Sequence, residues 1–282
     1  MKARLSKNNI QKFRNAVYKE YRKNRRDFLW RPPALKLRRG KADPYCILVS
    51  EIMLQQTQVS RVTEKYPAFI KLFPTWQVLA SASRSGVLKA WSGLGYNRRA
   101  LYLKKIAEIV VQKFKGIMPH APQKLIELPG IGSNTTGAIS AFAFGKALPF
   151  IETNIRSVFI HHFFPKKKKI SDKEILPLVA ETLDTENPRE WYYALMDYGA
   201  MLKATSPNPS RKSAHHQHQT AFEGSHRQLR GEILKILLMR NMSEQSLTKK
   251  LKKDTAKIRT ALAELAREKF IKKRGHVWCI CE

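Results

Sequence analysis

A Pro-Gly-x-Gly turn between two amphipathic segments constrains the fold of this chain more than any other feature. It runs from Leu128 to Gly132, and the polar residues Ser-Asn-Thr-Thr follow it directly and open a helix. We expect its glycines to take positive φ angles and to let the backbone approach a ligand with no Cβ in the way. Free N–H groups at a helix N-terminus bind anions. The turn therefore predicts two helices joined by a hairpin that grips an anion.

The charge of the chain indicates the kind of anion. The 282 residues include 53 Lys and Arg against 22 Asp and Glu, which gives a formal net charge of +31. This excess favours a nucleic-acid partner, although a ribosome-associated or simply basic protein fits the charge as well. No apolar run reaches the roughly 20 residues of a membrane span, and the first residues lack the apolar core of a secretory signal. We therefore expect a cytoplasmic protein without membrane contact.

Helical periodicity dominates the first 204 residues, and the alternation typical of strands is nearly absent. Apolar residues recur at helical spacing over 8–28, and Asp43 followed by Pro44 is typical of a helix start. These patterns predict an all-α core. Beyond the helix that starts at Pro44, we expect helices over 60–72, 77–82, 84–91, 98–114, 122–127, 133–143, 153–163, 171–183 and 188–202.

The remaining residues divide into a linker and a small domain. Residues 205–225 are polar and include His215, His216 and His218, which lack Cys or acidic partners and therefore indicate a solvated connector instead of a metal site. Residues 226–282 contain three amphipathic helices and an alternating segment around Gly275, the pattern of a winged helix with its hairpin. Its excess of Lys and Arg favours DNA binding over protein contact. The predicted domains are 1–204 and 226–282, joined by the 205–225 linker.

Glu51 is the first candidate for chemistry. Ile47, Leu48 and Leu54 lie within one helical turn of it, so its carboxyl group projects from an apolar face. A carboxyl group in apolar surroundings has a raised pKa and can donate a proton near neutral pH. The alternative is a carboxylate at the edge of the core that pairs with an arginine such as Arg31.

The segment that contains Glu51 closely resembles the signature helix of the MutY-type adenine DNA glycosylases, members of the helix-hairpin-helix glycosylase superfamily. This segment is Ser50 to Val59, and the likeness covers about residues 10–205 in order. It includes Leu29-Trp30-Arg31, Trp91 to Tyr96, Leu128 to Gly132 and Met196 to Met201. The resemblance implies two helical subdomains with the active site between them. It also implies a monomer that acts on bacterial nucleoid DNA, flips a mismatched or damaged nucleotide out of the duplex and cleaves its N-glycosidic bond.

The resemblance also implies roles for individual residues. Glu51 matches the acid that protonates the purine so that the base can leave. Gln56 and Tyr96 match residues that insert into the duplex, and Trp30 and Arg31 match residues around the extruded base. The full set of expected substrate-binding and DNA-binding residues is Trp30, Arg31, Leu54, Gln55, Gln56, Tyr96, Gly130, Gly132, Asn134 and Tyr193.

Two departures from the family pattern concern the reaction itself. Glu152 stands where the family carries the aspartate that stabilises the oxocarbenium-like sugar, and Asn154 is retained beside it to orient this centre. Asn134 occupies the position of the Schiff-base lysine of bifunctional relatives such as endonuclease III. Without that amine a covalent lyase step is not expected, so the resemblance implies a monofunctional enzyme with Glu51, Glu152 and Asn154 as catalytic residues and water as the nucleophile.

Two further departures concern cofactor and specificity. The positions of the family's iron–sulfur cysteines fall on Lys203, Ser210 and Ser213, so we expect no cluster and no metal. Tyr193 occupies the position of a base-reading Glu or Gln, and the winged helix replaces the Nudix-like domain that inspects 8-oxoguanine. The leading hypothesis is excision of adenine opposite guanine or 8-oxoguanine. The alternatives are excision of another base, such as thymine or uracil opposite guanine or hypoxanthine, and non-catalytic binding to DNA structures.

Overall fold

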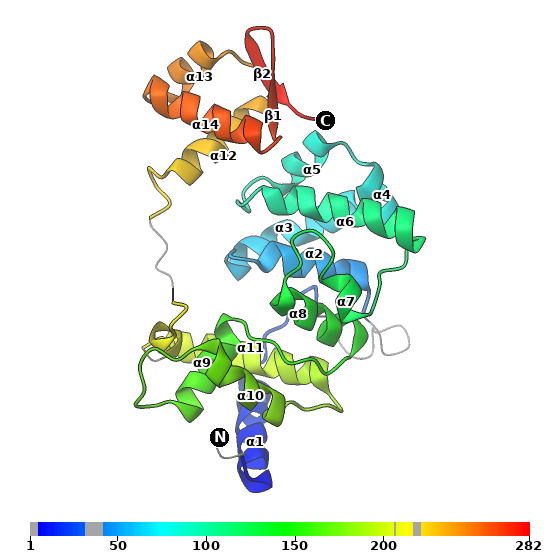
Figure 1. Cartoon of the computed structure of the whole chain (residues 1–282), viewed down its shortest axis with the longest axis vertical. Coiled ribbons are helices and arrows are strands. Elements are labelled where there is room, and N and C mark those ends of the chain that lie inside the picture. Colours follow the sequence, from blue (N-terminus) through cyan, green and yellow to red (C-terminus); the bar gives the residue numbers. More distant parts are fainter. Residues whose placement is uncertain (1–4, 32–41, 206, 217–220) are drawn as a thin grey trace. The chain divides into compact units, whose positions relative to one another are not determined.

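The computed structural model describes residues 5–31, 42–205, 207–216 and 221–282, and it is mostly helical (Figure 1). His218 and part of the predicted linker lie outside the described residues. The elements are α1 (Lys7–Asn24), α2 (Pro44–Leu54), α3 (Val59–Leu72), α4 (Trp76–Ser81), α5 (Arg84–Trp91), α6 (Arg98–Phe114), α7 (Pro122–Leu125), α8 (Ser133–Phe144), α9 (Thr153–Phe163), α10 (Asp172–Thr182), α11 (Pro188–Thr205), the 3-10 helix η2 (Pro209–Lys212), α12 (His226–Leu237), α13 (Glu244–Leu251), α14 (Thr255–Arg267), β1 (Ile271–Arg274) and β2 (Val277–Ile280).

The chain forms two compact units, each built from two segments. The first unit comprises residues 1–51 and 118–217, and the second comprises residues 52–117 and 218–282. The predicted helical character is confirmed, and the predicted helices begin and end close to those observed. The predicted domain boundaries at 204 and 226 remain a prediction.

Helix α11 is the centre of the first unit. It packs against α9, α1 and α8, and its residues Trp191 and Tyr192 are fully buried. Gly199 makes the contact with α9 possible, because a Cβ at this position would lie 2.2 Å from the carbonyl oxygen of Asn154. The sequence thus brings the start of α9 against α11 at backbone distance, and this approach positions the site described below.

The second unit contains α3 to α6 and the C-terminal elements. Helix α6 packs on α4 and α5, while α12 and α13 pack on α14. β1 and β2 form an antiparallel hairpin with Ile271 opposite Ile280, and the turn between them contains Gly275 with a φ of 58°. Three helices followed by a hairpin match the predicted winged helix. No helix in the described ranges is long and apolar enough to cross a membrane.

Candidate active site

Glu51 lies in the last part of α2, on a helix that starts as the sequence predicts. The Asp43 side chain accepts a hydrogen bond from the backbone N–H of Tyr45 at 2.9 Å, which caps the helix. The neighbours Leu48 and Ile52 are buried, and Glu51 itself is partly buried. Burial is the main cause that raises the pKa of Glu51 to about 7, and the charge of Glu152 acts in the same direction. Glu51 can therefore hold a proton near neutral pH.

Glu152 is the N-cap of α9, and both of its carboxylate oxygens are engaged. Oε1 accepts from the backbone N–H groups of Asn154 at 2.8 Å and Ile155 at 3.0 Å. Oε2 accepts from Nδ2 of Asn154 at 3.2 Å. These three donors hold the Glu152 carboxylate in one orientation at the start of α9. The site therefore holds one carboxyl group that favours the proton and one fixed carboxylate, a division of roles typical of glycosidic-bond cleavage.

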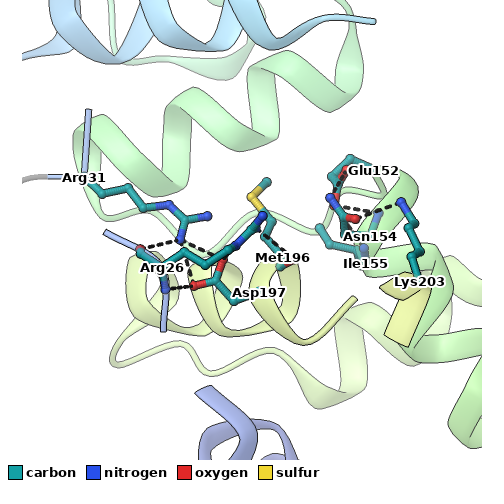
Figure 2. Close-up of polar contacts among 8 residues, drawn as sticks. All are labelled: Arg26, Arg31, Glu152, Asn154, Ile155, Met196, Asp197 and Lys203. Atoms are coloured by element: carbon teal, nitrogen blue, oxygen red, sulfur yellow. Dashed lines mark hydrogen bonds and ion pairs between the residues drawn. The ribbon is translucent and has the colours of Figure 1, made fainter. Parts of the chain in front are cut away.

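Asn154 links this carboxylate to α11. Lys203, near the end of α11, donates from Nζ to Oδ1 of Asn154 at 2.8 Å. Figure 2 shows the three side chains Glu152, Asn154 and Lys203 in one connected row. The sequence points to Glu152 and Asn154, but it places Lys203 only as a substitute for a cluster cysteine.

Arg31 is held by an acid other than Glu51. Its Nη1 lies 2.9 Å from both carboxylate oxygens of Asp197, and the backbone N–H and Nε of Arg26 donate to the same carboxylate at 3.0 and 2.7 Å (Figure 2). Asp197 is buried, so it requires these cationic partners. Among the described residues Arg31 therefore pairs with Asp197 and not with Glu51.

Tyr193 lies between two flat groups and close to the charges of the site. The guanidinium of Arg31 lies 4.4 Å from the centroid of its ring, and the ring of Phe142 stacks on it at 4.6 Å. Among the described residues its buried hydroxyl has no hydrogen-bond partner. Burial raises the pKa of Tyr193, so this hydroxyl stays protonated. Trp30, which the sequence predicts for the same pocket, is buried and stacks on Phe28 at 4.8 Å.

The glycine-rich turn precedes α8 as predicted, but its two glycines differ. Gly130 has a φ of 77°, which confirms the expectation. Gly132, the N-cap of α8, has a φ of −98° and a ψ of −178°, so the expected positive φ is wrong for this residue. A Cβ at Gly132 would meet no atom of the described chain within 4 Å, which leaves its outer side open to a ligand. Asn134 accepts from the backbone N–H of Ile151 at 3.4 Å.

The residues expected to insert into DNA belong to the second unit. Gln56 has a φ of 52° and Tyr96 a φ of 46°, although neither is glycine. Such strain is concentrated at functional positions. Leu54 ends α2 and Gln55 starts the turn that follows it; both are partly buried, whereas Gln56 is exposed.

Arg99 holds both strained turns, and sequence reasoning missed it. Its guanidinium donates to the carbonyl groups of Ile52 and Met53 at 2.9 Å, and to those of Leu94 and Gly95 at 3.1 and 2.9 Å. Burial lowers the pKa of Arg99 to about 10, so it remains charged. Arg99 also donates to the Thr57 hydroxyl at 2.9 Å, so its guanidinium ties the two turns together. Only its place three residues after Tyr96 offers a signal in the sequence.

The segment where the resemblance places cluster cysteines is held by polar and backbone contacts. Ile170 and Ser213 form an isolated β-bridge. The backbone N–H of Ile170 donates to the Lys212 carbonyl, and that of Ala214 donates to the Ile170 carbonyl, both at 2.9 Å. Ser210 is buried and donates to the Asn208 side chain at 2.8 Å. Lysine and serine side chains do not supply the thiolates that an iron–sulfur cluster requires. The residues at these positions therefore do not fit such a cluster.

The described structure thus brings together one set of predicted residues within the first unit. Glu51, Glu152 and Arg31 interact electrostatically, and Tyr193 and Asn154 join them through the contacts above. Leu54, Gln55, Gln56 and Tyr96 form a second set in the other unit, where Arg99 connects the two turns.

Comparison with known proteins agrees with this geometry. The family model described as HhH-GPD superfamily base excision DNA repair protein matches residues 49–182. The adenine DNA glycosylase of Mycolicibacterium smegmatis is 34% identical over 230 residues, covering 76% of this chain and 76% of that protein.

The adenine DNA glycosylase of Buchnera aphidicola subsp. Baizongia pistaciae is 40% identical over 166 residues, covering 57% of this chain and 46% of that protein. The chain therefore spans about half the length of this second relative. Among solved structures, a thermostable thymine-DNA glycosylase is 25% identical with a TM-score of 0.59, covering 70% of this chain and 89% of that one.

Proposed function

This chain belongs to the adenine DNA glycosylase family of the HhH-GPD base excision DNA repair superfamily, and we propose that it is a monofunctional glycosylase that excises adenine opposite guanine or 8-oxoguanine. It acts as a monomer on double-stranded DNA in the bacterial nucleoid. The observation that carries the proposal is the pair of carboxyl groups with different roles, Glu51 with a pKa of about 7 and Glu152 fixed at the start of α9.

The proposed reaction begins with a proton from Glu51. Protonation of the flipped purine turns the base into a good leaving group, and general acids of this kind contribute about 100- to 10,000-fold to a rate. As the bond to the base breaks, positive charge develops on the sugar, and the fixed carboxylate of Glu152 stabilises it electrostatically. Water then adds to the sugar and gives a proton to the Glu51 carboxylate formed in the first step, which leaves an abasic site and the free base.

The absence of a lyase step is supported by Asn134. A lyase of this family needs an amine that attacks the sugar carbon, and the Asn134 side chain is an amide that accepts a hydrogen bond from Ile151. The DNA strand is therefore left intact after the base is removed. The proposal that the enzyme works without an iron–sulfur cluster is supported by Lys203, Ser210 and Ser213, which supply no thiolate.

Adenine as the target is supported by the similarity to adenine DNA glycosylases. Tyr193 is the residue on which the choice of base depends. Its hydroxyl is a neutral donor and acceptor that no described protein group uses. A phenol reads a base edge less exclusively than a carboxylate or an amide. Because a solved thymine-DNA glycosylase has a similar fold, thymine opposite guanine is the second candidate.

The test is excision from labelled duplexes that carry A opposite 8-oxoguanine, A opposite G, T opposite G, U opposite G, or hypoxanthine. Cleavage of the A strands only after alkali supports the proposal, and cleavage before alkali contradicts the monofunctional assignment. Cleavage of only the T or U strands would show that the excised base is a pyrimidine and not adenine. If every duplex is bound and none is cut, the protein is a DNA-structure binder. Stoichiometric iron, or absorbance near 400 nm, in the purified protein contradicts the cluster-free assignment.

A further inference from the structure

Lys203 extends the catalytic centre beyond the residues that the sequence identifies. It donates to Oδ1 of Asn154 at 2.8 Å, and Nδ2 of the same amide donates to Oε2 of Glu152 at 3.2 Å (Figure 2). The ammonium group therefore stands at one end of a row of hydrogen bonds, and the Glu152 carboxylate stands at the other end.

The chemistry of these groups allows only one orientation of the amide. An ammonium group can only donate, and a carboxylate can only accept. If the Asn154 amide turned over, its NH2 group would face the Lys203 donor and its oxygen would face the Glu152 carboxylate. Both contacts would then be repulsive, so Lys203 selects the orientation in which the amide donates to Glu152.

The surroundings of Lys203 are consistent with this use of its charge. Burial lowers its pKa, whereas the negative charge of Glu152 raises it. Arg156 on α9, whose charge also acts on Lys203, is occupied by its ion pair with Asp172 at 2.7 Å. Within the described ranges Lys203 has no carboxylate partner of its own. A partly buried ammonium group without an ion pair is costly, and its contact here is the amide that holds Glu152.

Helix geometry fixes the reach of this side chain. Gly199 lies one turn before Lys203 on α11, and a Cβ there would lie 2.2 Å from the backbone oxygen of Asn154. The two backbones therefore touch, and the lysine spans a defined distance to the amide. A fixed Asn154 amide matters more when residue 152 is a glutamate than when it is an aspartate, because the extra methylene of glutamate adds a rotatable bond.

We propose that Lys203 is a positioning residue that fixes the Asn154 amide and, through it, holds the Glu152 carboxylate where charge develops on the sugar. The expected effect of Lys203 on the rate rests on the proposed glycosylase function. The contact between Lys203 and Asn154 does not rest on it.

The first test compares single-turnover excision from the A opposite 8-oxoguanine duplex. Lys203→Met is expected to lower the rate about 10- to 100-fold, the effect of small errors in the position of a reacting group, with unchanged affinity for the duplex. Lys203→Arg retains a donor and is expected to recover part of the rate. Lys173→Met removes the same charge from an exposed position in the same unit, and it is expected to leave the rate unchanged.

A double-mutant cycle then asks whether Lys203 acts through Asn154. In the Asn154→Ala background, Lys203→Met is expected to cause no further loss, because the intermediary is gone. Additive losses would overturn the proposal. So would a Lys203→Met protein whose rate equals that of Lys173→Met, or a loss that appears only in DNA affinity.

The second test does not depend on activity. The side-chain NH2 signals of Asn154 can be assigned by their disappearance in Asn154→Ala. In the wild-type protein they are expected away from the values of free asparagine, and in Lys203→Met they are expected to move toward those values. If the wild-type protein cuts no duplex, the proposed function fails, and these signals still decide whether Lys203 holds the amide. Unchanged signals in Lys203→Met overturn the inference in either case.

Discussion

Glu51 and Glu152 are electrostatically coupled: burial, and after it the charge of Glu152, raises the pKa of Glu51 to about 7. Glu152 itself is held by two backbone N–H groups and the Asn154 amide. The protein therefore favours the proton on Glu51 and holds the Glu152 carboxylate in a fixed orientation. The division of roles arises from local structure, since one carboxyl group lies on an apolar helix face and the other caps a helix.

The first prediction concerns the pH dependence of excision. Because the raised pKa keeps Glu51 protonated below about pH 7, the single-turnover rate is expected to be level at lower pH and to fall about tenfold per pH unit above that value. Glu51→Gln is expected to lose at least about 100-fold in rate and to keep its affinity for DNA. A Glu51→Gln protein with a normal rate would show that the acid is misassigned.

A second prediction follows for stability. Since folding raises the pKa of this acid, its contribution to stability is full below the unfolded value near 4.5 and is lost as the pH rises through about 7. Glu51→Gln is therefore expected to increase the free energy of unfolding at pH 8 by about 1–3 kcal/mol. At pH 4 it is expected to have little effect. Urea unfolding at both values checks the sign, and a destabilised variant at pH 8 would contradict it.

The third prediction compares two adjacent tyrosines. The Tyr192 hydroxyl donates to the Leu148 carbonyl at 2.9 Å, whereas the Tyr193 hydroxyl has no partner among the described residues. Tyr192→Phe is expected to lower the free energy of unfolding by about 1–2 kcal/mol and to leave the choice of base unchanged. Tyr193→Phe is expected to leave stability equal or higher and to change the relative excision rates of the five duplexes.

The outcome for Tyr193 is informative in both directions. If Tyr193→Phe destabilises the protein as much as Tyr192→Phe, its hydroxyl has a structural partner. If stability is kept and the pattern of excised bases is also unchanged, the hydroxyl does not read the base, and its ring acts only by stacking.

The fourth prediction concerns the open side of the glycine-rich turn. Gly132 and Gly231 both have space for a Cβ within the described structure and negative φ angles. Gly132→Ala is therefore expected to fold normally and to weaken binding to undamaged duplex, because a methyl group would stand between the α8 N-terminus and a phosphate. Gly231→Ala is the matched control, with unchanged affinity. Equal affinities of the two variants, measured by fluorescence anisotropy, would contradict a phosphate contact at Gly132.

The sequence could predict those parts of the site that are encoded locally. Glu51 lies on one apolar helix face, and Glu152 and Asn154 are separated by one residue, so short motifs identify them. The contacts that complete the site are distant in sequence. Lys203 and Asn154 are 49 residues apart, and Arg31 and Asp197 are 166 apart. Nothing in a single sequence says that these pairs meet. The contact of Lys203 with Asn154, for example, depends on how α9 and α11 pack at Gly199.

The glycine-rich turn shows a second limit of reasoning from sequence. A positive φ is the common reason for glycine in a turn, and it holds for Gly130. Gly132 is an extended N-cap with open space beyond it. Sequence alone could not separate a glycine required by the backbone from one that leaves room for a ligand.

The last prediction concerns Arg99, the clamp of the two turns with Gln56 and Tyr96. Arg99→Met is expected to destabilise the protein by about 3 kcal/mol or more, because several buried carbonyl groups lose their donor. The positive φ angles at Gln56 and Tyr96 then lose their support. Arg98→Met is the neighbouring control: it removes a half-exposed ion pair with Glu268, which is expected to contribute no more than about 1 kcal/mol. Thermal and urea unfolding of the two variants measure the difference, and equal losses would show that the Arg99 contacts do not hold the turns.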